Sequence, residues 1–181
     1  DILKAQLAKS LNVALTSSTG RVLDAVSALL GICREKTYDG EPAMKLESAA
    51  IGGRTALWDL PFYRDASSEV LSTRELMRRA LREYKGTQPG DLQHISDIAG
   101  SFQYNLARGI ARLAIHAAND FDINLVALSG GVAYNRMIRE TIIDQIHHAG
   151  LELQINAEYP LGDGCISFGQ CRYAAAIINA S

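Results

Sequence analysis

Near the C-terminal end of the sequence, one arrangement occurs twice: a short apolar run, a glycine-rich turn and a helical pattern. The first apolar run is Ile123 to Leu128, and its turn contains Gly130 and Gly131. The second run is Leu151 to Ile155, followed by the turn Gly162-Asp163-Gly164. Strands that alternate with helices are typical of an α/β sheet joined by right-handed crossovers. Because glycine turns at a helix start let backbone N–H groups approach a phosphate closely, the arrangement predicts nucleotide binding.

Helical periodicity dominates the preceding two thirds of the sequence. We therefore expect residues 1–120 to form a mainly helical part and residues 121–181 an α/β part. The longest helix is predicted at 92–119, where apolar residues recur every three or four positions. The other predicted elements are helices at 1–12, 22–30, 42–51, 72–84, 134–148 and 166–179, and strands at 56–63, 123–128 and 151–155.

Composition and charge exclude several classes of partner. The sequence has 18 basic and 20 acidic residues, a formal net charge of −2, so it offers no basic field and we expect no nucleic-acid partner. No apolar run approaches the roughly 18–20 residues that span a bilayer, and no signal peptide is present, so we expect no membrane partner. The three cysteines form no Cys-x-x-Cys pair, which favours a reducing cytoplasm.

Four motifs in a fixed order carry a resemblance that covers the sequence nearly from end to end. They are 16–26 (TSSTGRVLDAV), 37–47 (TYDGEPAMKLE), 128–136 (LSGGVAYNR) and 162–170 (GDGCISFGQ). With them, the sequence resembles the C-terminal half of the larger catalytic domain of the hydrogenase-maturation carbamoyltransferases, the HypF family. That family is related to the tRNA threonylcarbamoyl transferases. The resemblance implies the second lobe of an actin/sugar-kinase-like fold, an α/β class in which two lobes clamp a nucleotide and a mixed sheet is flanked by helices.

The resemblance also implies which residues contact the nucleotide. Gly130 and Gly131 are implied to contact phosphate, and Asn135 is implied to contact the nucleotide. Asp163 is implied to bind a divalent metal (zinc, iron or magnesium) together with two histidines of the first lobe that lie four residues apart. The residues implied to lie at the substrate, ribose or nucleoside are Asp24, Gly40 and Glu41. No two histidines of this sequence have that spacing; they are His94, His116, His147 and His148.

The activity that the resemblance implies belongs to a larger enzyme. That enzyme uses ATP and carbamoyl phosphate, forms carbamoyl-adenylate and transfers the carbamoyl group to the C-terminal cysteine of the partner HypE, for the cyanide ligands of [NiFe]-hydrogenase. The first-lobe phosphate loop and the acylphosphatase-like, zinc-finger and YrdC-like modules are not in this sequence. We therefore expect residues 1–181 to be a fragment that is inactive alone. A lobe of a tRNA threonylcarbamoyl transferase and a non-catalytic nucleotide-binding module of the same fold remain as alternatives.

Each implied contact also has a purely structural interpretation. Asp163 lies between two glycines, and aspartate and glycine favour turns for backbone reasons alone. Gly130 and Gly131 suit any tight turn between a strand and a helix. Asn135 fits an exposed position in the first turn of its helix.

The motifs of the helical part leave similar alternatives. Asp24 fits a surface position or a partner for Arg21. Glu41 fits the start of a helix, where a carboxylate complements the helix dipole. Glu47 lies on the same predicted helix, and we expect it on a solvated face.

Overall fold

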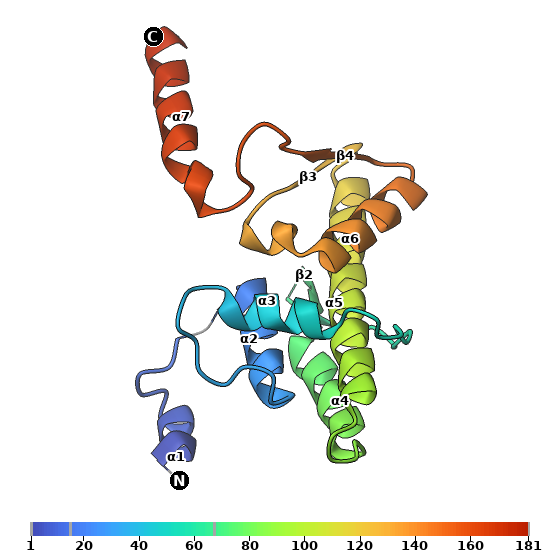
Figure 1. Ribbon diagram of the computed structural model, residues 1–181. Helices are drawn as coiled ribbons and strands as arrows, with labels where there is room; N and C mark the ends of the chain where they lie inside the picture. Colours follow the sequence, from blue (N-terminus) through green and yellow to red (C-terminus); the bar gives the residue numbers. More distant parts are fainter. Residues whose placement is uncertain (1, 15, 67, 181) are drawn as a thin grey trace.

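The computed structural model describes residues 2–14, 16–66 and 68–180 of the chain (Figure 1). A helical first part is followed by a part in which strands and helices alternate. The elements are α1 (Ile2–Ala8), α2 (Thr19–Leu29), α3 (Glu41–Ala49), β1 (Phe62–Asp65), β2 (Ser68–Leu71), α4 (Thr73–Lys85), α5 (Leu92–Asp120), β3 (Leu125–Leu128), the 3₁₀ turn η1 (Gly131–Tyr134), α6 (Arg136–His148), β4 (Glu152–Ile155), the 3₁₀ turn η2 (Asp163–Cys165) and α7 (Ile166–Ala180).

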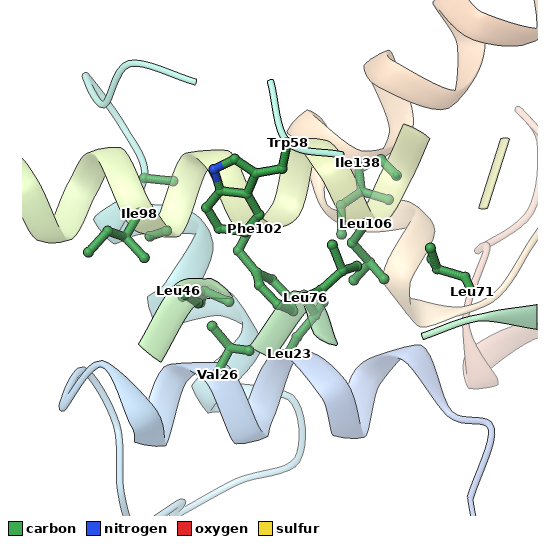
Figure 2. Packing of buried hydrophobic residues seen from close by; sticks show 14 of the residues in the cluster. Leu23, Val26, Leu46, Trp58, Leu71, Leu76, Ile98, Phe102, Leu106 and Ile138 are labelled. Carbon is green, nitrogen blue, oxygen red and sulfur yellow. The ribbon is translucent and has the colours of Figure 1, made fainter. Parts of the chain in front are cut away.

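The hydrophobic core surrounds α5, which contacts α3, α4 and α6 (Figure 1). One stripe of α5, which includes Ile98, Phe102 and Leu106, enters this core (Figure 2). Phe102 has no exposed surface, and leucines of α2 and α3 belong to the same cluster. The apolar periodicity that predicted a helix at 92–119 is therefore confirmed as the stripe that holds the helical part together.

The α/β part contains a single parallel strand pair among the described residues. Leu125 pairs with Glu152 and Leu128 with Ile155, and α6 makes the crossover between β3 and β4. A separate antiparallel pair, β1 with β2, lies in the helical part. The α/β class is therefore confirmed, but within the described ranges the strands form two separate two-stranded sheets and not the single mixed sheet that was expected.

The prediction of a strand at 56–63 was wrong for most of its length. Of the residues predicted as a strand, only Phe62 and Tyr63 belong to β1, and residues 54–61 form no strand. Side chains of α5 bond to this backbone instead: Ser101 Oγ accepts the N–H of Ala56 at 2.9 Å, and Asn105 Oδ1 accepts the N–H of Trp58 at 2.9 Å. Because these bonds take the place of a neighbouring strand, the segment is extended without joining a sheet.

The first and last helices extend away from the body of the molecule (Figure 1). Helix α1 is shorter than the predicted 1–12, whose first residue, Asp1, lies outside the described residues; α7 agrees with the predicted 166–179. Neither helix has a buried side chain in the part that the structure describes, and Ile2 and Tyr173 are 80% and 72% exposed.

None of the helices in the described part of the chain is both long enough and apolar enough to cross a bilayer.

Candidate functional site

The two glycine-rich turns at the C-terminal side lie against each other. The N–H of Gly130 donates to the carbonyl of Leu161 at 2.7 Å, and the N–H of Gly162 donates to the Tyr134 hydroxyl at 3.2 Å. A Cβ atom at Gly162 would lie 3.0 Å from Tyr134 Cε2, a tight contact, and 3.5 Å from Gly131 Cα, an ordinary van der Waals distance, so the two turns are in direct contact. The sequence placed these turns at corresponding strand-to-helix junctions, and the structure brings them together.

The beginning of α2 lies beside the first of these turns. A Cβ atom at Gly20 would lie 3.9 Å from a methyl group of Val132. One guanidinium nitrogen of Arg21 lies 3.1 Å from a carboxylate oxygen of Asp24 and 3.3 Å from one of Asp39. Because Asp39 directly precedes Gly40, Arg21 links the motif at 16–26, which contains Asp24, to the motif at 37–47. Asp24 thus has the arginine partner that its structural interpretation required.

The backbone N–H groups at the two helix starts differ in availability. Among the described residues, the N–H groups of Gly131 and Val132 have no hydrogen-bond acceptor, because they begin the η1 turn. At the start of α6, in contrast, the N–H of Ile138 donates to Asn135 Oδ1 at 3.0 Å and that of Arg136 donates to Glu47 Oε1 at 2.7 Å. The η1 turn therefore presents free donors to an anion, whereas these two donors of α6 are already used.

Asn135 is buried rather than exposed, so its interpretation as an exposed first-turn residue was wrong. It is the N-cap of α6, and its Nδ2 donates to Gln103 Oε1 at 2.6 Å. Both ends of its side-chain amide are therefore occupied within the protein. In this arrangement Asn135 fixes the end of the glycine loop, and its contact with a nucleotide stays a prediction.

Glu41, the first residue of α3, is also buried and fully bonded. Its Oε2 accepts the N–H of Thr37 at 2.5 Å and the Thr37 hydroxyl at 3.0 Å, while Lys45 Nζ lies 2.7 Å from Oε1. The bond from Lys45, followed by that from the Thr37 N–H, lowers the pKa of the Glu41 carboxyl to about 2. The carboxylate thus closes the 37–41 turn and positions Gly40, which has a left-handed φ of 84°.

We expect Glu41 to make stability depend on acid pH. A carboxyl whose pKa falls on folding from its ordinary 4.5 to about 2 stabilises the protein fully above pH 4.5, and this contribution is lost as the pH falls through 2. The free energy of unfolding should therefore decline between these pH values, and Glu41→Gln should make the decline shallower. Urea unfolding of the chain at a series of pH values, followed by fluorescence of its single tryptophan, Trp58, measures this slope.

Asp97 supplies an internal reference for that experiment. The N–H of Arg54, among other groups, lowers the pKa of the Asp97 carboxyl to about 2, so part of the pH dependence persists in Glu41→Gln. Equal slopes in the wild type and Glu41→Gln would contradict the role of Glu41.

Asp163 is exposed at the start of η2, and its carboxylate has no hydrogen-bond or ion-pair partner among the described residues. No cluster of three or more histidine, cysteine or carboxylate side chains is found in the described ranges. A single carboxylate does not hold a divalent cation, so the residues of this chain do not by themselves fit a resident metal. The geometry leaves Asp163 free to supply one oxygen ligand to a site completed by other residues.

Two residues at this site were not predicted from the sequence. Glu47 was expected on a solvated face, but it accepts the N–H of Arg136, 89 residues along the chain. Gln103 was not singled out, although a glutamine beside the apolar stripe of α5 was a usable signal. It is fully buried and bonds to Asn135.

A cavity of about 320 Å³ lies away from these residues, between segment 54–58, the end of α4 and the first turns of α5. Its charged lining groups and its histidine are already paired: Arg54 with Asp97 at 2.9 Å, Glu83 with Arg79 at 2.6 Å, and the His94 ring with the carbonyl of Glu83 at 3.3 Å. None of the predicted site residues lines it.

Comparison with known proteins supplies an independent result. The sequence model of a family described as "Carbamoyltransferase, Kae1-like Domain, second subdomain" matches residues 1–170. The chain is 40% identical over 169 residues to the probable carbamoyltransferase HypF of Methanocaldococcus jannaschii, covering 93% of this chain and 21% of that protein. It is 26% identical over 147 residues to the tRNA N6-adenosine threonylcarbamoyltransferase of Tropheryma whipplei, covering 78% of this chain and 36% of that protein.

Two solved structures are similar to the whole chain. T. kodakarensis HypF has a TM-score of 0.83 at 38% identity, covering 99% of this chain and 22% of that one. A full-length HypF in the phosphate- and nucleotide-bound form also has a TM-score of 0.83, at 30% identity, covering 98% of this chain and 23% of that one. The chain thus spans about a fifth of the length of the HypF proteins that it matches.

Proposed function

Because the chain belongs to the carbamoyltransferase HypF family, as the second subdomain of the Kae1-like domain, we propose that it forms one wall of a nucleotide-binding cleft. The other wall belongs to the remainder of a longer protein. The observation that carries the proposal is the meeting of the two glycine turns, with the free N–H groups of Gly131 and Val132 on one turn and the unpaired carboxylate of Asp163 on the other. A nucleotide-bound relative of the same fold supports ATP as the ligand.

In this proposal, the backbone of the chain binds phosphate. The N–H groups of Gly131 and Val132 donate to phosphate oxygens, and the lack of a side chain at Gly131 permits the approach. Glu41 and Asn135 act mainly by holding the loops that carry Gly40 and Gly131. Asp163 supplies one ligand to a divalent metal whose histidine ligands lie outside this chain; when bound, such a metal neutralises phosphate charge.

We propose carbamoyl transfer to HypE as the reaction of the full-length protein. Carbamate, released from carbamoyl phosphate elsewhere, attacks the α-phosphorus of ATP and displaces pyrophosphate. The thiolate of the partner's C-terminal cysteine then attacks the carbonyl carbon; a C–S bond forms, the bond to the AMP oxygen breaks, and AMP leaves. This chain needs to supply no nucleophile, because the partner's thiolate attacks. Residues 1–181 alone are expected to be inactive, because the first-lobe phosphate loop and the histidine ligands of the metal are not among them. Because Cys33, Cys165 and Cys171 are all free thiols, a reducing cytoplasm suits the protein.

The similarity to a tRNA threonylcarbamoyl transferase supports a second candidate, threonylcarbamoyl transfer to tRNA. The net charge of −2 argues against a nucleic-acid partner bound by this chain. Incubating the full-length protein with ATP and radiolabelled carbamoyl phosphate distinguishes the candidates. Label on HypE supports the first; a parallel incubation with radiolabelled threonylcarbamoyl-adenylate that labels tRNA supports the second, and label on neither supports a non-catalytic nucleotide-binding module.

The variant Gly131→Ala tests the phosphate contact directly. No atom lies within 4 Å of a Cβ built at Gly131, so the fold accommodates the methyl group. If a phosphate lies against this glycine, the methyl group displaces it, and we expect affinity for an ATP analogue to fall about tenfold or more, equivalent to about 1.4 kcal/mol. Calorimetric titration of the full-length protein measures the change.

Gly169→Ala is the matched control, since a Cβ there also meets nothing within 4 Å and the residue lies in α7, outside the two turns. Equal affinities of Gly131→Ala and the wild type would remove this turn from the nucleotide site.

A further inference from the structure

Gln103 is a fully buried amide on α5 that joins three separate elements. Its Nε2 donates to the carbonyl of Leu46 in α3 at 3.3 Å and to that of Ala99, one turn earlier in α5, at 3.0 Å. Its Oε1 accepts from Asn135 Nδ2, at the start of α6. Both polar ends of the side chain are therefore used, and each bond lies out of contact with water.

These bonds allow only one orientation of the two amides. Because two carbonyl groups face Nε2 of Gln103, its Oε1 must point to Asn135, and Asn135 must present its NH₂ group there. Asn135 Oδ1 is then the end that accepts the N–H of Ile138 and caps α6. Reversing either amide would place oxygen against oxygen in the core, which costs free energy when no water is near.

The same network connects the motif that contains Gly40 with the motif that contains Gly131, both of which belong to the proposed cleft. Leu46 and Glu47 are adjacent in α3: the carbonyl of Leu46 binds Gln103, and the carboxylate of Glu47 accepts the N–H of Arg136. Helix α3 begins with Gly40 as its N-cap, and Asn135 directly follows the η1 turn that contains Gly131. The position of one motif is therefore tied to that of the other through Gln103.

We infer that Gln103 is a positioning residue for nucleotide binding: it holds Asn135, and through it the 130–135 loop, in the orientation that presents the free N–H groups of Gly131 and Val132. This inference rests on the proposed function. It assigns a role in binding to a residue that lies in the core and contacts no ligand.

Asn105, two residues further along α5, provides a matched control. It is also a fully buried amide; its Nδ2 donates to the carbonyl four residues earlier, Ser101, at 2.7 Å, and to that of Ala56 at 2.8 Å. Its Oδ1 accepts the N–H of Trp58. Both amides donate to two carbonyl groups; Asn105 Oδ1 additionally accepts from Nη1 of Arg108 at 2.9 Å, and Asn105 holds segment 54–58 and makes no bond to the glycine turns.

The test compares Gln103→Met with Asn105→Leu in the full-length protein, since each replacement keeps the approximate shape and removes the polar groups. Both variants should melt at lower temperature. Calorimetric titration with a non-hydrolysable ATP analogue, at a temperature where both are folded, should show affinity about tenfold weaker for Gln103→Met and within about twofold of wild type for Asn105→Leu. An equal loss in both, or no loss in Gln103→Met, would overturn the inference.

The variant Asn135→Ser keeps the inference testable if Gln103→Met does not fold. A serine still caps the helix, but its hydroxyl lies one bond nearer the backbone than Asn135 Nδ2; it should lose the bond to Gln103 and also weaken nucleotide binding. Where Gln103→Met does fold and Gln103 acts through Asn135, the double variant should bind no more weakly than either single variant, whereas multiplied losses would show independent roles and overturn the inference. A wild-type protein that does not bind the analogue would refute the proposed function itself.

Discussion

Substituting alanine for Asn135 is expected to lower the free energy of unfolding by about 2–4 kcal/mol. Two losses combine in this variant. The N–H of Ile138 loses the side chain that caps α6, which costs about 1 kcal/mol, and the buried Oε1 of Gln103 loses its donor, which costs about 1–3 kcal/mol. Urea unfolding of the chain, followed by Trp58 fluorescence, measures the change because this tryptophan is buried in the same core.

Asn135→Ser separates the two losses. The serine hydroxyl retains the cap but not the bond to Gln103, so its effect should fall between wild type and Asn135→Ala. Equal stability of Asn135→Ala and the wild type would show that the buried amide pair makes no net contribution.

Asp163→Ala in the full-length protein is expected to remove one equivalent of bound metal and to reduce carbamoyl transfer by more than about 100-fold. The carboxylate is exposed and has no hydrogen-bond or ion-pair partner among the described residues, so the melting temperature without metal should not change. Elemental analysis of the purified protein measures the metal content. Unchanged metal content would refute the assignment of Asp163 as a ligand.

Glu158→Ala is the control for Asp163→Ala. Glu158 is an exposed carboxylate on the same connection between β4 and η2, and its side chain likewise has no partner among the described residues. A loss of metal in both variants would indicate a general effect of negative charge on this loop rather than coordination by Asp163.

The helices with strong periodicity were predictable from the sequence, and segment 54–61 was not. Helix α5 has a continuous apolar stripe and an aspartate cap, Asp91, so both of its ends agree with the prediction within one residue. Segment 54–61 contains apolar residues typical of a strand, but its hydrogen-bond partners are side chains about 45 positions away, on α5. The pattern of apolar residues within a segment carries no information on hydrogen-bond partners that are distant in sequence. The short β1–β2 hairpin was missed for the same reason.

The candidate site shows a similar division. The family to which the chain belongs is the one that the motifs indicated. The motifs could not show that the side-chain polar atoms of Glu41 and Asn135 are already bonded. Thr37 and Lys45 bond to Glu41, and Gln103 bonds to Asn135. Glu47 lay on a face that the sequence assigned to solvent, and only the fold brings it to Arg136.

The polar residues on α5 limit how this half of a cleft can move. Ser101 and Asn105 hold segment 54–58, while Gln103, between them in sequence, holds α3 and the start of α6. Twisting this 29-residue helix about its long axis would rupture both sets of bonds together. In the proposed cleft, closure on a ligand would therefore carry α3, α5 and α6 as one unit, and amide hydrogen exchange in these three helices should slow by a similar factor when nucleotide binds.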